Sequence, residues 1–193
     1  MEEFESLDAS LYTEAPNEYE LEFKNLLLNI YSCYLLIIDD NTKIPNNENN
    51  IRDILFEYLK NEKIRQESCF IERYRFDKEV DEGKGRVDIK IVSINDFENF
   101  EAYFIIECKR LDGTSTLNKK YVSEGIDRFT SKKYSSYYGI NGMIGFVVRN
   151  IDIDINIKKI GNFFDCIEKD KLYTTTHTNL KLYHLMMDFS SLI

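Results

Sequence analysis

The segment from Lys84 to Arg110 decides the fold of this chain. It reads Lys-Gly-Arg-Val-Asp-Ile-Lys-Ile-Val (84–92), then an acidic loop, then Ala-Tyr-Phe-Ile-Ile-Glu-Cys-Lys-Arg (102–110). The pattern predicts two successive strands, with Asp88 on the first and with Glu107 and Lys109 on the second. Because side chains alternate along a strand, Glu107 and Lys109 point to one face and Cys108 points to the other. We therefore expect two carboxylates and one ammonium to converge at one spot.

The position of the Glu107–Lys109 pair carries this expectation, because the pattern acid-any-Lys is common. It occurs four times in the chain, at 22–24, 82–84, 88–90 and 107–109. The last copy alone ends an apolar run, Ala102 to Ile106, that is typical of a strand buried on both faces. A buried Glu and Lys are costly without a partner or a metal ion. The alternative is a plain Glu–Lys pair at a solvated strand end.

Such a constellation suits metal-assisted chemistry. Carboxylate oxygens are hard ligands of the kind that Mg²⁺ and Mn²⁺ prefer. A lysine beside the metal can orient or deprotonate the water that attacks a phosphodiester.

Length and composition predict one globular domain. The chain has 193 residues, of which 43% are hydrophobic and 13% aromatic, enough for a core without disulfide bonds. It contains no run of about 18 apolar residues and its N-terminus is acidic, so we expect a cytoplasmic protein with no membrane partner. The cysteines form no Cys-x-x-Cys pair or Cys/His cluster, and we expect them to be reduced and mostly buried: Cys33, Cys69, Cys108 and Cys166.

The net charge of −9 is concentrated at the N-terminus. Residues 1–22 contain eight acidic residues and no basic residue, so residues 23–193 carry only −1. We expect an acidic, weakly ordered leader at 1–16 and a single domain at 17–193. The leader is interpreted as a solvated tail, and the alternative is a segment that competes with nucleic acid for a basic groove. A nearly neutral body remains compatible with a polyanionic partner.

The remaining periodicities predict helices on both sides of a mixed sheet. Helices are expected from apolar residues at helical spacing, at 18–38, about 47–61, 121–138 and 154–169. Asn46 or Asn47 is expected to cap the second helix. Strands are expected at 68–76, 86–94, 102–110, 143–149 and 179–189, the first two as an antiparallel hairpin joined by a turn at 81–85. Helices before and after such a sheet make a three-layer α/β domain with an N-terminal helical extension.

This order of elements resembles the PD-(D/E)xK nuclease superfamily, which has the restriction-endonuclease-like fold. The resemblance covers about residues 46–150, the expected nuclease core, and rests on Asp88 followed by Glu107-Cys108-Lys109. It implies that Asp88 and Glu107 bind one or two Mg²⁺ (or Mn²⁺) ions, joined by the backbone carbonyl of Cys108. It also implies that Lys109 assists the nucleophilic water. The chain departs from the motif at Val87, where the name motif has Pro.

Many members of this superfamily also place a Glu on the helix before the hairpin, and Glu48 is the matching residue here. Ile51 and Leu55 follow it at three and seven positions, which puts Glu48 near the inner face at the start of the helix. The resemblance makes Glu48 a third metal ligand. The alternative, given equal weight, is that Glu48 only stabilises the helix N-terminus by its charge. Asp53 and Glu57 are weaker rivals for the ligand role.

Substrate contacts are expected on the helix after the second of the two strands. Arg128 and Lys132 lie four residues apart and are candidates for binding a phosphate of the substrate. The alternative, which the spacing favours, is a surface ion pair between Glu124 and Arg128. Of the two histidines, His177 is the weak candidate for a role in the site, and His184 receives none.

These features together predict a Mg²⁺- or Mn²⁺-dependent nuclease that hydrolyses phosphodiester bonds, with DNA as the expected substrate although RNA fits the same chemistry. The resemblance alone places such domains in restriction, phage defence or repair. Sequence specificity would come from loops, a homodimer mate or a larger complex. Two alternatives stand beside this expectation. One is a catalytically silent nucleic-acid-binding or assembly subunit with the same fold, and the other is an interaction protein that oligomerises through an exposed apolar face of the helix at 18–38.

Overall fold

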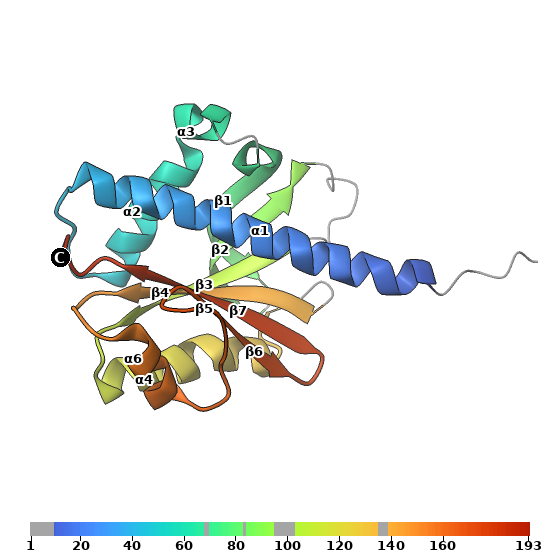
Figure 1. Cartoon of the computed structure of the whole chain (residues 1–193). Helices are drawn as coiled ribbons and strands as arrows, with labels where there is room; N and C mark the ends of the chain where they lie inside the picture. Colours follow the sequence, from blue (N-terminus) through green and yellow to red (C-terminus); the bar gives the residue numbers. More distant parts are fainter. Residues whose placement is uncertain (1–9, 68–69, 83, 95–102, 135–138) are drawn as a thin grey trace, which may run out of the picture.

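The computed structural model describes residues 10–193 except 68–69, 83, 95–102 and 135–138 (Figure 1). The strands of the described part are β1 Tyr74–Glu82, β2 Gly85–Ser93, β3 Tyr103–Leu111, β4 Ile140–Val147, β5 Asp165–Glu168, β6 Leu172–His177 and β7 Leu180–Asp188. The helices are α1 Ser10–Asp40, α2 Glu48–Lys60, α3 Glu62–Glu67, α4 Ser115–Tyr121, α5 Asp127–Thr130 and α6 Ile153–Ile160. A 3₁₀ turn spans Ile71–Arg73, and a π-helical segment, Val122–Ile126, joins α4 to α5.

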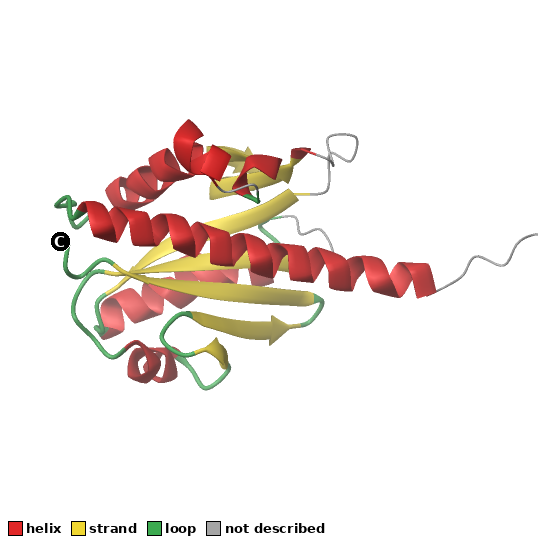
Figure 2. Cartoon of the chain, turned by 45° about the horizontal axis from the view of Figure 1, so that its top comes forward, coloured by secondary structure: helices red, strands yellow, loops and turns green. Residues whose placement is uncertain are grey.

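The strands form one mixed sheet, in the order β1-β2-β3-β4-β7-β6-β5, with helices on both faces (Figure 2). The central strand β4 pairs in parallel with β3 and with β7, whereas every other pair is antiparallel. The predicted antiparallel hairpin is confirmed, but its first strand runs from Tyr74 to Glu82 rather than over 68–76, because residues 71–73 form the 3₁₀ turn and 68–69 lie outside the described part. A parallel β3–β4 pair needs a crossover, which α4, the π-helical segment and α5 supply. The chain is therefore an α/β protein with a seven-stranded mixed sheet and an N-terminal helix.

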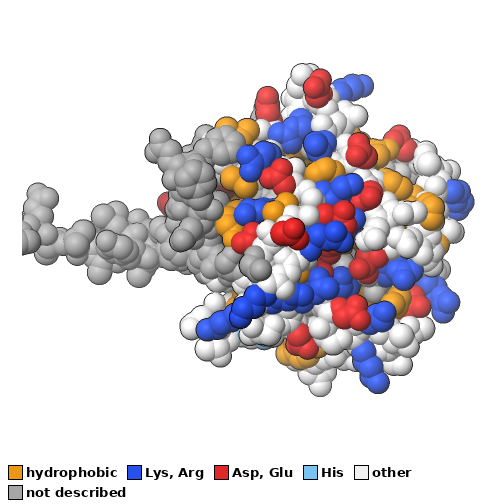
Figure 3. All heavy atoms as spheres, turned by 180° about the vertical axis from the view of Figure 1, so that it is seen from behind, with side chains coloured by type: hydrophobic (Ala, Val, Ile, Leu, Met, Phe, Trp, Pro, Cys, Tyr) orange, Lys and Arg blue, Asp and Glu red, His pale blue; other side chains and the backbone are white. Residues whose placement is uncertain are grey.

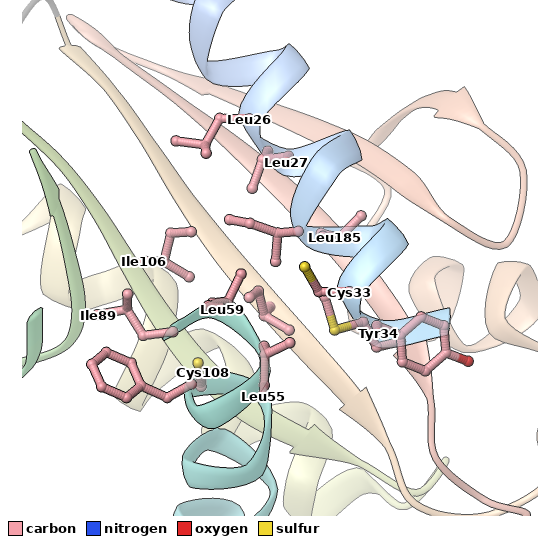
Figure 4. Close-up of a cluster of buried hydrophobic side chains, with 14 of the residues drawn as sticks. Leu26, Leu27, Cys33, Tyr34, Leu55, Leu59, Ile89, Ile106, Cys108 and Leu185 are labelled. Carbon is pink, nitrogen blue, oxygen red and sulfur yellow. The ribbon is translucent and has the colours of Figure 1, made fainter. Parts of the chain in front are cut away.

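Helix α1 covers one face of the sheet. Its buried side chains recur every three or four positions, as a core-facing helix requires: Tyr19, Phe23, Leu26, Leu27, Ile30, Cys33, Tyr34 and Ile37. Figure 4 shows Leu26 and Leu27 directed toward Ile106 of β3 and Leu185 of β7. The main apolar face of α1 is thus covered within the monomer, contrary to the alternative in which it is exposed for oligomerisation.

Helix α1 is longer than its sequence pattern predicts. It begins at Ser10 rather than at residue 18, so residues 10–16 of the expected leader are helical, and residues 1–9 lie outside the described part. Its C-terminal end is followed by Asn41 with φ 50°, a left-handed residue of the kind that stops helices. By length and composition, the part of α1 from Asn17 onward is the one described helix that could cross a membrane, a test that buried core helices also pass.

A second core lies on the opposite face of the sheet, under α4, α5 and α6. Ile105 and Leu111 of β3 belong to this core together with Tyr121 and Phe129, whereas Ile106 of the same strand belongs to the core under α1. Because side chains alternate along β3, this strand contributes residues to both cores. The prediction that this strand is buried on both faces is confirmed, because its residues from Tyr103 to Lys109 are all buried.

The predicted helix at 121–138 is wrong at both ends. The helical stretch begins at Ser115, where the Thr114 hydroxyl accepts a hydrogen bond from the Leu117 amide, and it ends at Thr130. Lys132 adopts φ 55°, and the amides of Lys132 and Lys133 donate to the carbonyls of Phe129 and Arg128. This is a Schellman ending, and it escaped prediction because the left-handed position holds Lys instead of Gly.

The C-terminal third also departs from the prediction. The helix expected at 154–169 ends at Ile160, before Gly161, and the chain continues as the exposed edge strand β5. Strand β6, which is rich in β-branched threonine, is not among the strands that the sequence predicted. Cys33 and Cys108 are free and buried as expected, Cys166 is free but exposed, and Cys69 lies outside the described residues.

His184 on β7 predicts a measurable pH dependence of stability. It is completely buried, with Nδ1 3.0 Å from the Tyr121 hydroxyl and Nε2 2.9 Å from the Thr175 hydroxyl. Burial, followed by the nearby His177, lowers the pKa of His184 to about 3. Below pH 6.5 the unfolded state therefore binds a proton that the folded state refuses, so stability falls as pH is lowered, by up to about 1.4 kcal/mol per pH unit.

Urea unfolding between pH 7 and pH 5 measures this slope. The variant His184→Gln should lack this contribution, so its stability should fall less steeply than that of the wild type as pH is lowered, while His177→Gln, a change at a half-buried histidine, should retain the contribution of His184. Identical pH profiles for wild type and His184→Gln would contradict the assignment.

Candidate active site

Strand β3 carries two charged side chains into the interior. Glu107 is 0% exposed and Lys109 is 6% exposed. Both point to the face covered by α4 and α5, as their alternation with Ile106 and Cys108 predicts. Charges buried to this degree require partners, because desolvation of an unpaired ion costs several kcal/mol. The contacts of these two side chains define the candidate site.

The site opens where β2 and β3 separate. Their paired register runs from Val92–Tyr103 to Ile89–Ile106. The next residue of each strand is Asp88 or Glu107. Beyond the last pair, one oxygen of the Asp88 carboxylate accepts the backbone amide of Cys108 at 2.8 Å. The Asp88 side chain thus satisfies a β3 amide at the fork between the strands, and this contact fixes its orientation.

The ammonium of Lys109 lies at the centre of the cluster. It donates to Glu48 Oε1 at 3.0 Å, to Glu107 Oε1 at 2.9 Å and to the carbonyl of Cys108 at 2.7 Å. Asp88 Oδ2 lies 4.0 Å away. Burial alone would lower the pKa of Lys109, but the surrounding carboxylates raise it above its ordinary value. The structure therefore brings together all four oxygen donors that the sequence nominated for a metal, around a cation supplied by the chain itself.

The donor set fits a hard divalent cation. Three carboxylates and one backbone carbonyl are the ligands that suit Mg²⁺ or Mn²⁺. As arranged here, no three His, Cys, Asp or Glu side chains of the described residues form a ready metal-binding group. The geometry gives the reason, because the Lys109 ammonium takes the position on which these oxygens converge. Lys109 and a divalent ion would compete for the same oxygens.

Glu107 is held by further contacts from the α5 side. Arg128 donates to its Oε1 at 2.6 Å, and the Tyr134 hydroxyl lies 3.0 Å from its Oε2. Burial, followed by repulsion from Asp88, raises the pKa of Glu107 to about 7 despite its contacts with Lys109 and Arg128. Sequence analysis missed Tyr134. A tyrosine on an expected amphipathic helix gives no signal that distinguishes a ligand of Glu107 from a packing residue.

Arg52 of α2 is a further member of the site that sequence analysis missed. Its side chain is buried, and it donates to Asp88 Oδ1 at 2.8 Å and to Asp53 Oδ1 at 3.0 Å. It also contacts Glu79, which adopts a left-handed φ of 54° in β1. Its position four residues after Glu48 was a usable signal, because that spacing returns to the same helix face. Asp53, a rival candidate for the ligand role, instead accepts a hydrogen bond from this arginine.

Glu48 lies at the start of its helix and also reaches the carboxylate cluster. It is the first residue of α2, directly after Asn47, whose side chain accepts the amides of Asn49 and Asn50 and so confirms the predicted cap. Its carboxylate is therefore in the first helical turn, where negative charge is favourable. The same carboxylate bridges Lys109 through Oε1 and the Arg110 amide through Oε2 at 3.1 Å.

The expected phosphate contacts at Arg128 and Lys132 do not form one group. Arg128 contacts Glu107 rather than Glu124, so the favoured surface pair is wrong, and Glu124 lies 3.9 Å from Lys120 instead. Because α5 ends at Thr130, Lys132 no longer sits one helical turn beyond Arg128. It is exposed and lines a separate cavity with His177.

The π-helical segment lets the crossover approach the site closely. A side-chain carbon at Gly125 would lie 2.3 Å from the Met143 methyl and 3.5 Å from Lys109 Cγ. Glycine therefore leaves room for the side chains of β3 and β4 beneath this turn. Single π turns within helices often occur at functional sites.

Arg52 should contribute strongly to the stability of the site. Arg52→Met removes the partner of a largely buried carboxylate, so we expect a loss of about 3 kcal/mol in unfolding free energy by urea denaturation. The matched change Arg75→Met affects a pair with Asp77 that is exposed, and should cost less than about 1 kcal/mol. Equal losses of unfolding free energy for the two variants would contradict the structural role assigned to Arg52.

Comparison with known proteins returned no match among protein-family models, curated proteins or solved structures. The chemistry of this site is therefore argued from its geometry.

Proposed function

We propose that this protein is a metal-dependent nuclease with a restriction-endonuclease-like core that hydrolyses phosphodiester bonds of DNA. One observation carries the proposal: the carboxylates of Glu48 and Glu107 and the carbonyl of Cys108 converge on the ammonium of Lys109, with Asp88 at the rim. Oxygen donors of this kind, gathered around one cation at a strand fork, are what metal-assisted phosphodiester hydrolysis requires. The mixed sheet with helices on both faces supports the proposed core.

The proposed metal ligands are Glu48, Asp88, Glu107 and the backbone carbonyl of Cys108, with Mg²⁺ or Mn²⁺ as the ion. A bound ion would act as a Lewis acid on the scissile phosphate and stabilise the charge that develops on it. The protein's own contribution begins with preorganisation. Arg52 and the Cys108 amide fix Asp88, while Arg128 and Tyr134 fix Glu107.

Lys109 serves the attacking water in this proposal. Its ammonium has three donors, and here all three are used by protein oxygens. When those carboxylates are engaged elsewhere, the same donors become available to orient a water molecule beside the phosphate. Burial of the site strengthens these interactions, since the local dielectric constant is lower than that of water.

The alternative function is a catalytically silent nucleic-acid-binding or assembly subunit with the same fold. One observation favours it: Lys109 and Arg128 already neutralise the carboxylates without an added ion. Binding of Mn²⁺ by isothermal titration calorimetry separates the two functions, because a silent subunit with an internal ion cluster needs no metal. For either function we retain DNA as the proposed partner, a homodimer or larger complex as the source of specificity, and a cytoplasmic setting in restriction, phage defence or repair.

Substitution of Lys109 should separate catalysis from metal binding. We expect Lys109→Ala to lower plasmid cleavage in Mg²⁺ by at least about 100-fold, because the water loses its orienting donor. Calorimetric affinity for Mn²⁺ should be unchanged or tighter, because a competing cation has been removed. Asp88→Asn should lose both properties. Wild-type cleavage by Lys109→Ala would end the mechanism proposed here.

Two glutamates of α2 provide a matched test of the ligand set. Glu48→Gln should weaken Mn²⁺ binding by roughly tenfold or more, the scale of a lost ligand contact. Glu57→Gln changes the same residue type at an exposed position of the same helix and should leave metal binding unchanged. If both variants bind Mn²⁺ like the wild type, Glu48 is only a helix-terminal charge.

A further inference from the structure

A cavity of about 930 Å³ lies at the C-terminal end of α5, next to the candidate active site. Three parts of the chain line it: Lys84 after β1, residues 129–130 and 132–134 at the end of α5, and residues 176–180 at the turn from β6 to β7. A volume of this size accommodates a small-molecule or nucleotide ligand. The cavity therefore has the dimensions of a binding site, and its lining indicates the ligand.

The described lining of this cavity is basic. It includes Lys84, Lys132, Lys133 and His177, together with threonine hydroxyls, and it contains no aspartate or glutamate. Within the described residues, none of the three lysines makes an ion pair. The nearest acidic influence on His177 comes from Asp127, which is outside the lining. Cations that form no ion pair with the described residues, gathered in a hollow of a chain with net charge −9, are a local feature that attracts anions.

The position of Lys133 is fixed by a glycine of β2. A side-chain carbon at Gly85 would lie 2.1 Å from Lys133 Cε and 2.8 Å from its Nζ. The lysine therefore lies across the bare backbone of Gly85 and is half-buried there. This packing places one cation of the cavity beside the start of β2, three residues before Asp88.

Tyr134 connects the cavity to the carboxylate cluster. It lines the cavity, while its hydroxyl lies 3.0 Å from Glu107 Oε2 and 2.8 Å from the carbonyl of Arg86. One aromatic side chain thus separates the unpaired lysines from the proposed catalytic carboxylate. Figure 3, which shows the face opposite α1, has a band of Lys and Arg side chains crossing below a mixed group of acidic and basic side chains.

We infer that this cavity binds phosphate groups of the nucleic acid strand that flanks the scissile bond. Lysines and threonine hydroxyls bind phosphate oxygens without reading the bases, so the site sets the position of the strand rather than its sequence. The inference rests on the proposed nuclease function for the identity of the ligand. Phosphate is the shared chemistry of a nucleic acid strand and of free phosphate or a nucleotide.

Binding measured without divalent metal tests the cavity independently of cleavage. The experiment uses fluorescence anisotropy of a short labelled DNA duplex and a single strand, in EDTA, at several salt concentrations. The cavity variant combines Lys84→Gln, Lys132→Gln and Lys133→Gln. The control variant has the same net charge and changes exposed lysines elsewhere, combining Lys63→Gln, Lys158→Gln and Lys159→Gln.

The cavity variant should bind DNA at least about tenfold more weakly at low salt. The slope of its log binding constant against log salt concentration should be shallower by about two to three, roughly one for each phosphate contact removed. The control variant should keep the wild-type slope. Equal affinities and slopes for the two variants, or no measurable DNA binding by the wild type, would overturn the inference.

Competition with inorganic phosphate and pyrophosphate distinguishes the two sources of phosphate. If the cavity binds a nucleic acid strand, phosphate and pyrophosphate should displace DNA no better than chloride does at the same ionic strength. Displacement specific to pyrophosphate, with no cavity-dependent DNA affinity, would identify a small-anion site and overturn the assignment to a strand. A different result would contradict the proposed nuclease function: a wild-type protein that binds DNA but shows no cleavage that depends on Asp88.

Discussion

The ammonium of Lys109 is the interaction on which this structure depends. It lies inside a strand that is buried on both faces, and three of its neighbours are carboxylates. Without a central cation, Glu107 would face Asp88 across the strand fork, and burial together with their repulsion already raises the pKa of Glu107. Removing one member of such a buried group leaves the others uncompensated, which is more costly than never placing them there. The cluster is therefore a fixed structural unit, whatever ion it holds.

The fork between β2 and β3 explains why the carboxylates gather at this position. A continuous ladder would satisfy the Cys108 amide with a backbone carbonyl and would leave no space for a ligand. Here the Asp88 carboxylate accepts that amide, and Arg52 holds its other oxygen. The separation of the strands thus leaves the Cys108 amide without a ladder partner and places an acid beside it. Helix α2 completes the arrangement, because its first residue, Glu48, reaches the same ammonium.

The sequence predicted the parts of this site that follow from period-two alternation. Glu107 and Lys109 share a face because they are two positions apart, and Asp88 meets them because a short connection joins the strands. Glu48 followed from helical spacing. Arg128 was nominated for a phosphate and turned out to hold Glu107, because its partner lies 21 residues away in the chain, on another element. Such long-range contacts leave no periodic trace.

Element ends were harder to predict for a related reason. The strand cores and the helix at 18–38 have strong apolar periods, and those elements are present. The helix ending at Thr130 depends on a left-handed Lys132, and the start of α1 at Ser10 lies in a polar, acidic stretch. The residue types at these two positions do not indicate a helix end or a helix start. The same ending displaced Lys132 from Arg128 and moved it into the cavity, so one unpredicted turn changed the apparent substrate contacts.

Net charge is a poor guide to what this chain binds, because its cations are divided into two groups. Lys109, Arg52 and Arg128 are engaged by carboxylates inside the candidate site and cannot attract a polyanion from solution. The described lysines of the cavity make no ion pair, and they lie one side chain away from Glu107. An anionic strand would therefore be held by the cavity and only brought past the carboxylates, which alone would repel it. Under the proposed function, separating attraction from chemistry in this way would let a chain with net charge −9 accommodate an anionic substrate.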